Sequence, residues 1–179
     1  MNLEEHLRVP AKGFKLADCD PADTAGLDKA KSSDRRAKDL ERLAALQERL
    51  YAESRQSLLI VIQAMDAAGK DGTIAHVMTG VNPQGVRVTS FKQPSQLELA
   101  HDWLWRCSAA LPVRGEIGIF NRSHYEEVLV TRVHPAYLAG QGIDPTHADD
   151  GFWAARLDAI AAWERHLSAC GTRVTSTSS

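Results

Sequence analysis

The chain has 179 residues, of which 44% are hydrophobic and 25% charged, enough for one globular domain with a sizeable core. The formal net charge of −2 excludes a strong overall attraction to nucleic acid or to an anionic membrane, so an anion site requires a local cluster of Lys and Arg. The three cysteines are too widely spaced for a metal site or a disulfide framework, and no segment resembles a signal peptide or a membrane span. We therefore expect a cytoplasmic protein with no nucleic-acid or membrane partner.

The first part of the chain predicts an arm followed by a long helix. Residues 1–25 are polar and contain prolines and glycine, which favours an extended arm. From Ser32 or Ser33 onward, leucines recur at helical spacing opposite charged residues, which is typical of an amphipathic helix that packs on a sheet. We therefore divide the chain into this arm and helix, residues 1–55, and a core domain, residues 56–179.

Residues 58–73 read LLIVIQAMDAAGKDGT and predict a phosphate-binding loop. The apolar run Leu58–Ile62 favours a strand buried on both faces of a parallel sheet. Small residues with Gly69 and Lys70 follow, and a helical pattern comes next, which is the arrangement of such a loop. Backbone N–H groups at the helix N-terminus and the Lys70 ammonium would then face an anion.

This loop departs from the usual pattern G-x-x-x-x-G-K-[ST]. Ala64 replaces the first glycine, Asp71 replaces the Ser or Thr, and Thr73 comes two residues later. The alternative interpretation is an ordinary strand-to-helix turn with a solvated lysine. Asp66 favours a phosphate site of a particular kind, because a carboxylate in the loop repels phosphate unless a divalent cation lies between them. The pattern therefore indicates a metal-bridged polyphosphate site.

Further strands and helices are predicted downstream. Alternating residues over 86–91 and an apolar run over 116–120 predict two more strands, and Ser95 is expected to cap a helix over 96–109. Lys92 and Arg122 follow these strands. Open α/β sheets bind ligands at the carboxyl ends of their strands, so we expect both cations near the phosphate loop.

Five blocks of sequence, in order and at fixed spacing, resemble the family-2 polyphosphate kinases. They cover nearly the whole chain and comprise residues 64–73, Asn82-Pro83 with Gly85-Val86, residues 91–94, residues 101–106 and residues 120–126. The resemblance implies an α/β fold of the P-loop kinase type, similar to thymidylate kinase, with a parallel sheet and helices on both faces. It also implies reversible phosphoryl transfer between inorganic polyphosphate and a nucleotide, with Mg2+ as cofactor. Expected partners are polyphosphate, adenine nucleotides, with guanine left open, and further copies of the chain in a homo-oligomer.

The resemblance also implies roles for individual residues. Asp66, Lys70 and Arg122 match the catalytic positions, with Asp66 as metal ligand. The matching phosphate- and nucleotide-binding positions are Ala67, Ala68, Gly69, Asp71, Gly72, Thr73, Lys92, Asn121, Glu126 and Arg132. Asn121 and Glu126 are similar to the subfamily that phosphorylates both nucleoside mono- and diphosphates, converting AMP to ADP and ADP to ATP.

The C-terminal part departs from the family. A helix is predicted from Asp149 or Asp150 to Gly171, and the family continues with a further core strand, a basic lid and more helices. Here Gly171–Val174 looks like the approach to that strand, and Thr and Ser dominate afterwards. We expect a core incomplete at its C-terminus with the lid region missing, whether by truncation, frameshift or fragmentation. A non-catalytic phosphate-binding remnant and an ATP-dependent small-molecule kinase of the same fold are the alternative functions.

Overall fold

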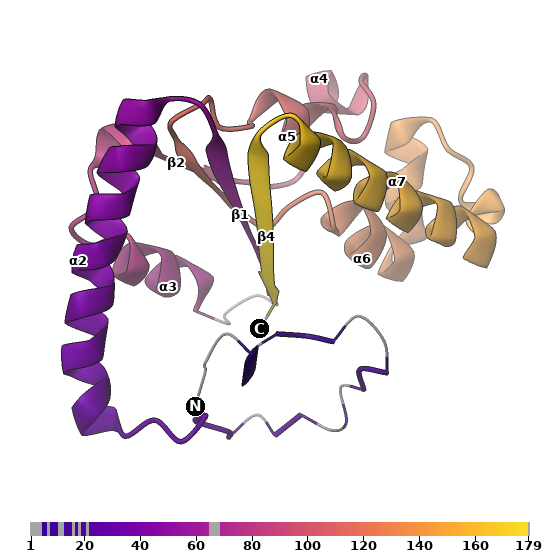
Figure 1. The fold of residues 1–179 in the computed structure, drawn as a ribbon. Coiled ribbons are helices and arrows are strands. Elements are labelled where there is room, and N and C mark those ends of the chain that lie inside the picture. The colour runs from indigo at the N-terminus through magenta and orange to yellow at the C-terminus, as the bar shows by residue number, and fades with distance from the viewer. Residues whose placement is uncertain are drawn as a thin grey trace.

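Four parallel strands form the central sheet of the protein (Figure 1), in the order β2-β3-β1-β4. The computed structural model describes residues 5–6, 8–10, 13–15, 17, 19–20, 22–64 and 69–178. The strands are β1 (Ser57–Gln63), β2 (Val86–Ser90), β3 (Ile117–Asn121) and β4 (Thr172–Ser178). The first three confirm the strands predicted from the sequence.

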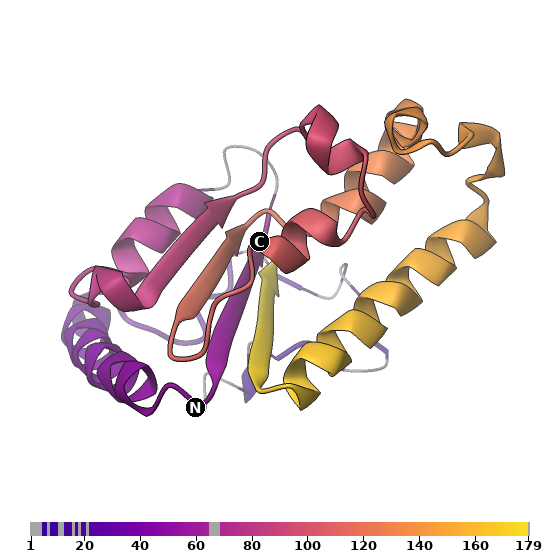
Figure 2. The same cartoon turned by 90° about the horizontal axis from the view of Figure 1, so that it is seen from above.

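Helices cover both faces of this sheet, which confirms the predicted α/β architecture (Figure 2). On one face lie α2 (Lys29–Glu53) and α3 (Lys70–Val77), and on the other α5 (Trp105–Ala109) and α7 (Asp150–Ala169). The remaining elements are α4 (Gln96–Leu99), α6 (Glu126–Val133) and the short 3-10 helices η2 (Pro83–Gly85), η3 (Pro135–Gln141) and η4 (Pro145–His147). No helix in the described ranges combines the length and the apolar character needed to cross a bilayer.

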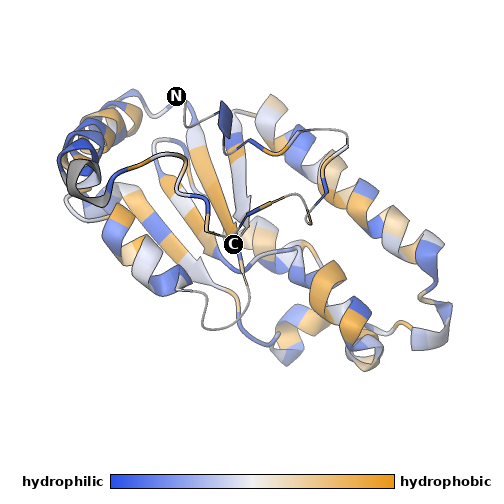
Figure 3. Cartoon of the chain, turned by 90° about the horizontal axis from the view of Figure 1, so that it is seen from below, coloured by the Kyte–Doolittle hydropathy of each residue, from blue (hydrophilic) through white to orange (hydrophobic). Residues whose placement is uncertain are grey.

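Helices pack on both faces of strand β1, and the prediction of full burial holds for one face, since Leu58, Ile60 and Ile62 on the other are half-buried. Leu59 and Val61 belong to the core beneath α5 and α7, together with Cys107 and Leu167. The alternate residues of β1 face the opposite layer, where Ile74 of α3 packs. Full burial of a side chain such as Leu59 or Val61 contributes roughly 1.5–3 kcal/mol, and the half-buried side chains on the opposite face contribute less. In Figure 3 the central strands are largely hydrophobic, whereas hydrophilic residues are frequent along the outer helices.

The long helix α2 packs on the α3 side of the sheet. Leu50 contacts the cluster formed by Ile74, Ile117 and Ile119. The helix begins at Lys29, a few residues before the predicted start at Ser32 or Ser33. A turn with left-handed backbone, at φ 52° and 65° for the two residues preceding Leu27, leads into it.

The prediction of one helix over residues 96–109 is wrong, because two short helices occupy this segment. Ser95 caps α4 as predicted, with its hydroxyl accepting from the Glu98 N–H and the Glu98 carboxylate accepting from the Ser95 N–H. The break is at Asp102, whose Oδ1 accepts from the Leu104 N–H at 2.9 Å and whose carbonyl accepts from Trp105 at 2.8 Å. A short carboxylate that bonds nearby backbone competes with the helical ladder in this way.

The expectation that the further core strand is missing is also wrong. The Thr- and Ser-rich tail forms β4, which pairs in parallel with β1 from Ser57↔Thr172 to Gln63↔Ser178. Threonine and valine favour strands, and β1 offers an edge of backbone groups that this segment satisfies. The preceding helix confirms its prediction, since the Asp149 carboxylate caps α7 by accepting from the Phe152 N–H at 2.8 Å.

Gly118 in the middle of β3 provides a test of this packing. A Cβ atom at Gly118 would lie 2.8 Å from Cδ and 2.9 Å from Cγ of Pro112, whose ring cannot move aside. We expect Gly118→Ala to lower the free energy of unfolding by about 1–3 kcal/mol, the usual effect of overpacking. Urea denaturation measures this change.

The double variant Gly118→Ala/Pro112→Ala is the control. Because it removes the two clashing ring atoms, it should lose less stability than the sum of the single variants. A Gly118→Ala protein as stable as the parent would contradict the arrangement of β3 against Pro112.

Candidate functional site

The carboxyl ends of β1, β2 and β3 open into one cleft of about 600 Å³. Because the strands are parallel, the segments that follow each of them meet at this edge. The lining residues are Gly69, Lys70, Asp71, Gly72, Ser90, Phe91, Lys92, Gln93, Asn121 and Arg122. The three cations expected at the site, Lys70, Lys92 and Arg122, therefore face one cavity.

The segment after β1 turns sharply into α3. Gly69 is the N-cap of this helix, with φ +78°, a left-handed conformation that favours glycine. The half-buried Lys70 donates from Nζ to the carbonyl of Ala64 at 2.9 Å, which ties the start of α3 to the end of β1. The hydroxyl of Thr73 donates to the Gly69 carbonyl at 3.1 Å. Three predicted positions, Asp66, Ala67 and Ala68, lie outside the described residues.

Asn121 joins the end of β3 to α3. Its Nδ2 donates to Oδ1 of Asp71 at 2.5 Å, and its carbonyl accepts from the Phe91 N–H at 3.0 Å. The neutral amide of Asn121 can donate a hydrogen bond to Asp71, whereas an ionised carboxylate at this position would repel it. Together the two bonds fix the ends of β2 and β3 against the first turn of α3.

Arg122 adopts a left-handed backbone, at φ +61°, which is uncommon for a residue with a side chain. Its N–H donates to the Ile62 carbonyl at 3.0 Å, so the strained conformation is locked to the end of β1. Its Nη1 lies 3.6 Å from Oε2 of Glu126, and Nε2 of Gln63 donates to the other oxygen of that carboxylate. Glu126 thus holds the guanidinium at the wall of the cleft.

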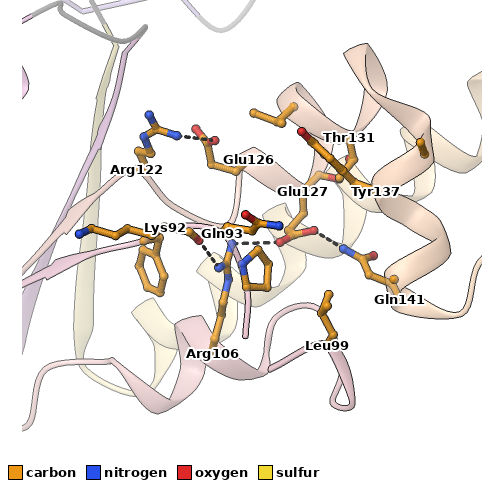
Figure 4. Close-up of a pocket in the computed structure, with 15 residues that line it drawn as sticks. Lys92, Gln93, Leu99, Arg106, Arg122, Glu126, Glu127, Thr131, Tyr137 and Gln141 are labelled. Carbon is orange, nitrogen blue, oxygen red and sulfur yellow. Dashed lines mark hydrogen bonds and ion pairs between the residues drawn. The ribbon is translucent and has the colours of Figure 1, made fainter. Parts of the chain in front are cut away.

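A second cavity, of about 380 Å³, adjoins the cleft (Figure 4). Its walls come from the segment after β2, from α6 and from η3, and most of the surface is apolar. The lining residues are Phe91, Lys92, Gln93, Pro94, Leu99, Arg106, Arg122, Glu126, Glu127, Val130, Thr131, Ala136, Tyr137, Gly140 and Gln141. Four of them, Phe91, Lys92, Gln93 and Arg122, also line the cleft, so the two cavities meet at these side chains. We call this second cavity the apolar pocket.

A buried ionic network lies behind the apolar pocket, and no sequence pattern predicts it. Nη2 of Arg106 donates to Oε1 of Glu127 at 3.2 Å, and Nε2 of Gln141 donates to Oε2 at 2.5 Å. Arg156 donates to the Glu127 carbonyl at 2.6 Å and to Gln141 Oε1 at 2.6 Å. Charged residues of these types are usually exposed, and only contacts between distant segments show that these are not.

Arg132 lies apart from both cavities. Its side chain is exposed and its Nη2 donates to Oδ1 of Asp150 at 2.8 Å. The structure therefore brings Lys70, Lys92, Arg122, Asn121 and Glu126 together but leaves Arg132 on the outer face of α6. Its role in anion binding stays a prediction.

Comparison with known proteins identifies close relatives over most of the chain. Residues 26–176 match the family model described as Polyphosphate kinase 2. An ADP-polyphosphate phosphotransferase from Rhodopseudomonas palustris is 54% identical over 137 residues, covering 75% of this chain and 47% of that protein. An AMP/ADP-polyphosphate phosphotransferase from Meiothermus ruber is 45% identical over 174 residues, covering 96% of this chain and 61% of that protein.

The fold has a solved counterpart. A crystal structure of polyphosphate kinase 2 from Arthrobacter aurescens superposes with a TM-score of 0.82 at 40% sequence identity, covering 95% of this chain and 58% of that chain. This match supports the P-loop kinase-like arrangement of the parallel sheet. The present chain spans about half to three-fifths of the length of the relatives it matches.

The reactivity of the Cys107 thiol tests whether the core beneath the cleft is closed to solvent. Cys107 is fully buried in the core next to Phe91, and this burial raises its pKa to about 12. Because the thiolate is the reactive form, we expect a disulfide reagent at pH 8 to modify only the exposed Cys19 and Cys170 in the native protein. Absorbance should report two fast thiols, and the third should react only after addition of urea.

The matched control is Cys107→Ala, which should leave both fast reactions and abolish the slow one. Three fast thiols in the native parent protein would show that the segment around Phe91 and Arg106 does not cover Cys107.

Proposed function

The chain belongs to the polyphosphate kinase 2 family, and on this basis we propose that it transfers a phosphoryl group between inorganic polyphosphate and an adenine nucleotide. The observation that carries the proposal is the convergence of Lys70, Lys92 and Arg122 on one cleft at the N-terminus of α3. Cations and backbone N–H groups gathered in this way suit a chain of phosphates. The relatives named as ADP- and AMP/ADP-polyphosphate phosphotransferases support the same substrates.

The two cavities offer separate places for the two substrates. The apolar pocket suits a nucleoside, because ligand pockets are mostly apolar with a few polar groups that fix orientation. A nucleotide bound there would direct its phosphates toward Arg122 and Lys92, which the two cavities share. The polyphosphate end would then lie in the cleft beside Lys70. Guanine nucleotides are a further option that the apolar walls leave open.

The reaction needs position and charge more than it needs a base. A phosphate monoester has a second pKa of about 6, so the accepting oxygen is largely ionised at neutral pH. The obstacle is repulsion between two anions. Lys70, Arg122 and the N–H groups at the start of α3 offset that repulsion, and they also stabilise the charge that spreads over the transferred group.

Magnesium is the cofactor we propose for this site. It prefers oxygen ligands and is commonly held by one or two carboxylates together with substrate phosphates. Asp71 supplies a carboxylate in the cleft, and the described residues contain no group of three His, Cys, Asp or Glu that could enclose an ion. The Asp71 carboxylate would suit an ion shared with the phosphates, and Asp66, which lies outside the described residues, is the further ligand that the family resemblance implies. When bound, the ion neutralises charge on the phosphate oxygens.

Two features of the whole protein belong to the same proposal. The three cysteines are free thiols, which agrees with a cytoplasmic location.

Leu129, Val133 and Tyr137 expose apolar surface on and near α6, which supports contact with further copies of the chain in a homo-oligomer.

Lys70→Ala tests the catalytic proposal. We expect polyphosphate-dependent ATP formation from ADP to fall by about 10²–10³, the usual effect of removing one transition-state donor, while urea unfolding stays cooperative and loses only about 1 kcal/mol for the missing bond to Ala64. Asp66→Asn should behave in the same way. Lys38→Ala removes an exposed lysine of α2 and serves as the matched control with parental activity.

The outcomes separate the alternatives. Near-parental turnover by Lys70→Ala would remove this lysine from the catalytic residues. ATP-dependent phosphorylation of an acceptor without any use of polyphosphate would favour the small-molecule kinase, and tight polyphosphate binding without turnover would favour the non-catalytic remnant.

The acceptor range tests the subfamily assignment. Because Asn121 and Glu126 match the version that uses both mono- and diphosphates, we expect polyphosphate to convert AMP to ADP as well as ADP to ATP. Chromatography of the nucleotides after incubation with AMP or ADP measures both steps. Conversion of ADP alone would make the subfamily assignment wrong while leaving the family function intact.

A further inference from the structure

The carboxylate of Glu127 is buried where three walls of the apolar pocket meet. Its side chain is 5% exposed, and that of its partner Arg106 is 8% exposed. One carboxylate oxygen accepts from Arg106 and the other from Gln141, while Arg156 makes an ion pair at 3.8 Å. Each of the two carboxylate oxygens thus accepts a hydrogen bond from a residue of another segment.

Arg106 extends this contact to the turn that separates the pocket from the cleft. Its Nη1 donates to the carbonyl of Lys92 at 2.9 Å, and its guanidinium lies 5.3 Å from the centre of the Phe91 ring. Figure 4 shows Arg106 between Lys92 and Glu127, with Gln141 reaching Glu127 from the other side. Glu127 therefore connects the turn after β2 to η3 across the back of the pocket.

Arg156 anchors the backbone of Glu127 on the side of α7. Its guanidinium lies 4.9 Å from the ring centres of both Trp103 and Phe152, and it donates to the backbone carbonyl of Glu127. Apolar side chains often stabilise a fold as well as a buried ion pair does. The ionic network adds directional contacts, because each hydrogen bond fixes the position of one segment that lines the apolar pocket.

We propose that Glu127 is a positioning residue for the apolar pocket. Through Arg106 it fixes the Lys92 carbonyl, and with it the turn that both cavities share, and through Gln141 it fixes the opposite wall. The nucleotide as occupant rests on the proposed function, whereas the effect of Glu127 on the turn does not. Arg106 and Glu127 are not among the residues that line the cleft proposed for the phosphates, so the proposed role is one of geometry.

Tryptic cleavage of the Lys92–Gln93 bond tests the position of the turn without any ligand. Glu127→Gln keeps the shape of the side chain but weakens its hold on Arg106, so cleavage at this bond should accelerate about tenfold, the effect of losing one charge-assisted hydrogen bond. Cleavage after Arg173 in β4 reports opening of the sheet and should change far less. Asp158→Asn, an exposed carboxylate change on α7, should leave both rates unchanged.

Binding measured by calorimetry tests the consequence for the ligand. In Glu127→Gln the Kd for AMP should rise about tenfold, while the Kd for tripolyphosphate should rise much less, because the cleft is also lined by Lys70 and the start of α3, which Glu127 does not contact. A purely structural role would weaken both ligands together and speed both cleavages. Should Glu127→Gln fail to fold, Arg106→Lys, which keeps the charge but cannot reach Lys92 and Glu127 together, is expected to give the same readouts.

Two results overturn the proposal: parental cleavage at Lys92–Gln93, or equal acceleration at Lys92 and Arg173. A parent chain that binds no AMP would reject the nucleotide pocket of the proposed function, and the proteolysis would still decide whether Glu127 positions the turn.

Discussion

The parallel pairing of β1 with β3 brings the segments that line the cleft to one edge of the sheet. Residues Leu58 to Ile62 pair in register with Ile117 to Asn121, so both strands end at the same level. The chain leaves one strand at Ala64 and the other at Arg122, and the Arg122 N–H bonds back to Ile62. A shift in this register would separate Lys70 from Arg122, and the cleft between them would no longer gather positive charge. The buried apolar faces of β1 prevent such a shift, because they hold helices on both sides.

Much of the fold could be predicted from the sequence, because its strongest elements have local causes. The apolar run at Leu58 and the Asp149 cap of α7 act within a few residues, so the sequence predicts both. The break at Asp102 is not predictable in this way, because a helical spacing of apolar residues continues through it. Strand β4 is hard to predict for the opposite reason: its Thr- and Ser-rich residues are weak signals by themselves, and pairing with a distant strand decides their conformation.

The residues of the site also fall into two groups, those that local sequence predicts and those that only distant contacts place. Gly69, Lys70 and Arg122 could be predicted because the position of a residue after a strand determines which edge of the sheet it occupies. Glu127 and Arg156 could not, because a charge on a helix looks the same in the sequence whether it faces water or a partner. Arg132, for which the family resemblance implies an anion contact, donates to Asp150 in this structure, and its role in anion binding stays a prediction.

The position of β4 has a consequence for synthesis of the protein on the ribosome. Ser57 and Thr172, which share a side-chain hydrogen bond at 2.9 Å, are 115 residues apart in the chain. While those residues are being translated, one edge of the central strand has no neighbour, and its backbone groups can pair with a strand of another nascent chain. Strand β4, which is rich in Thr and Ser, is itself a poor aggregation seed. The vulnerable period therefore lies before translation reaches this strand, when a chaperone that shields β1 would have the greatest effect on yield.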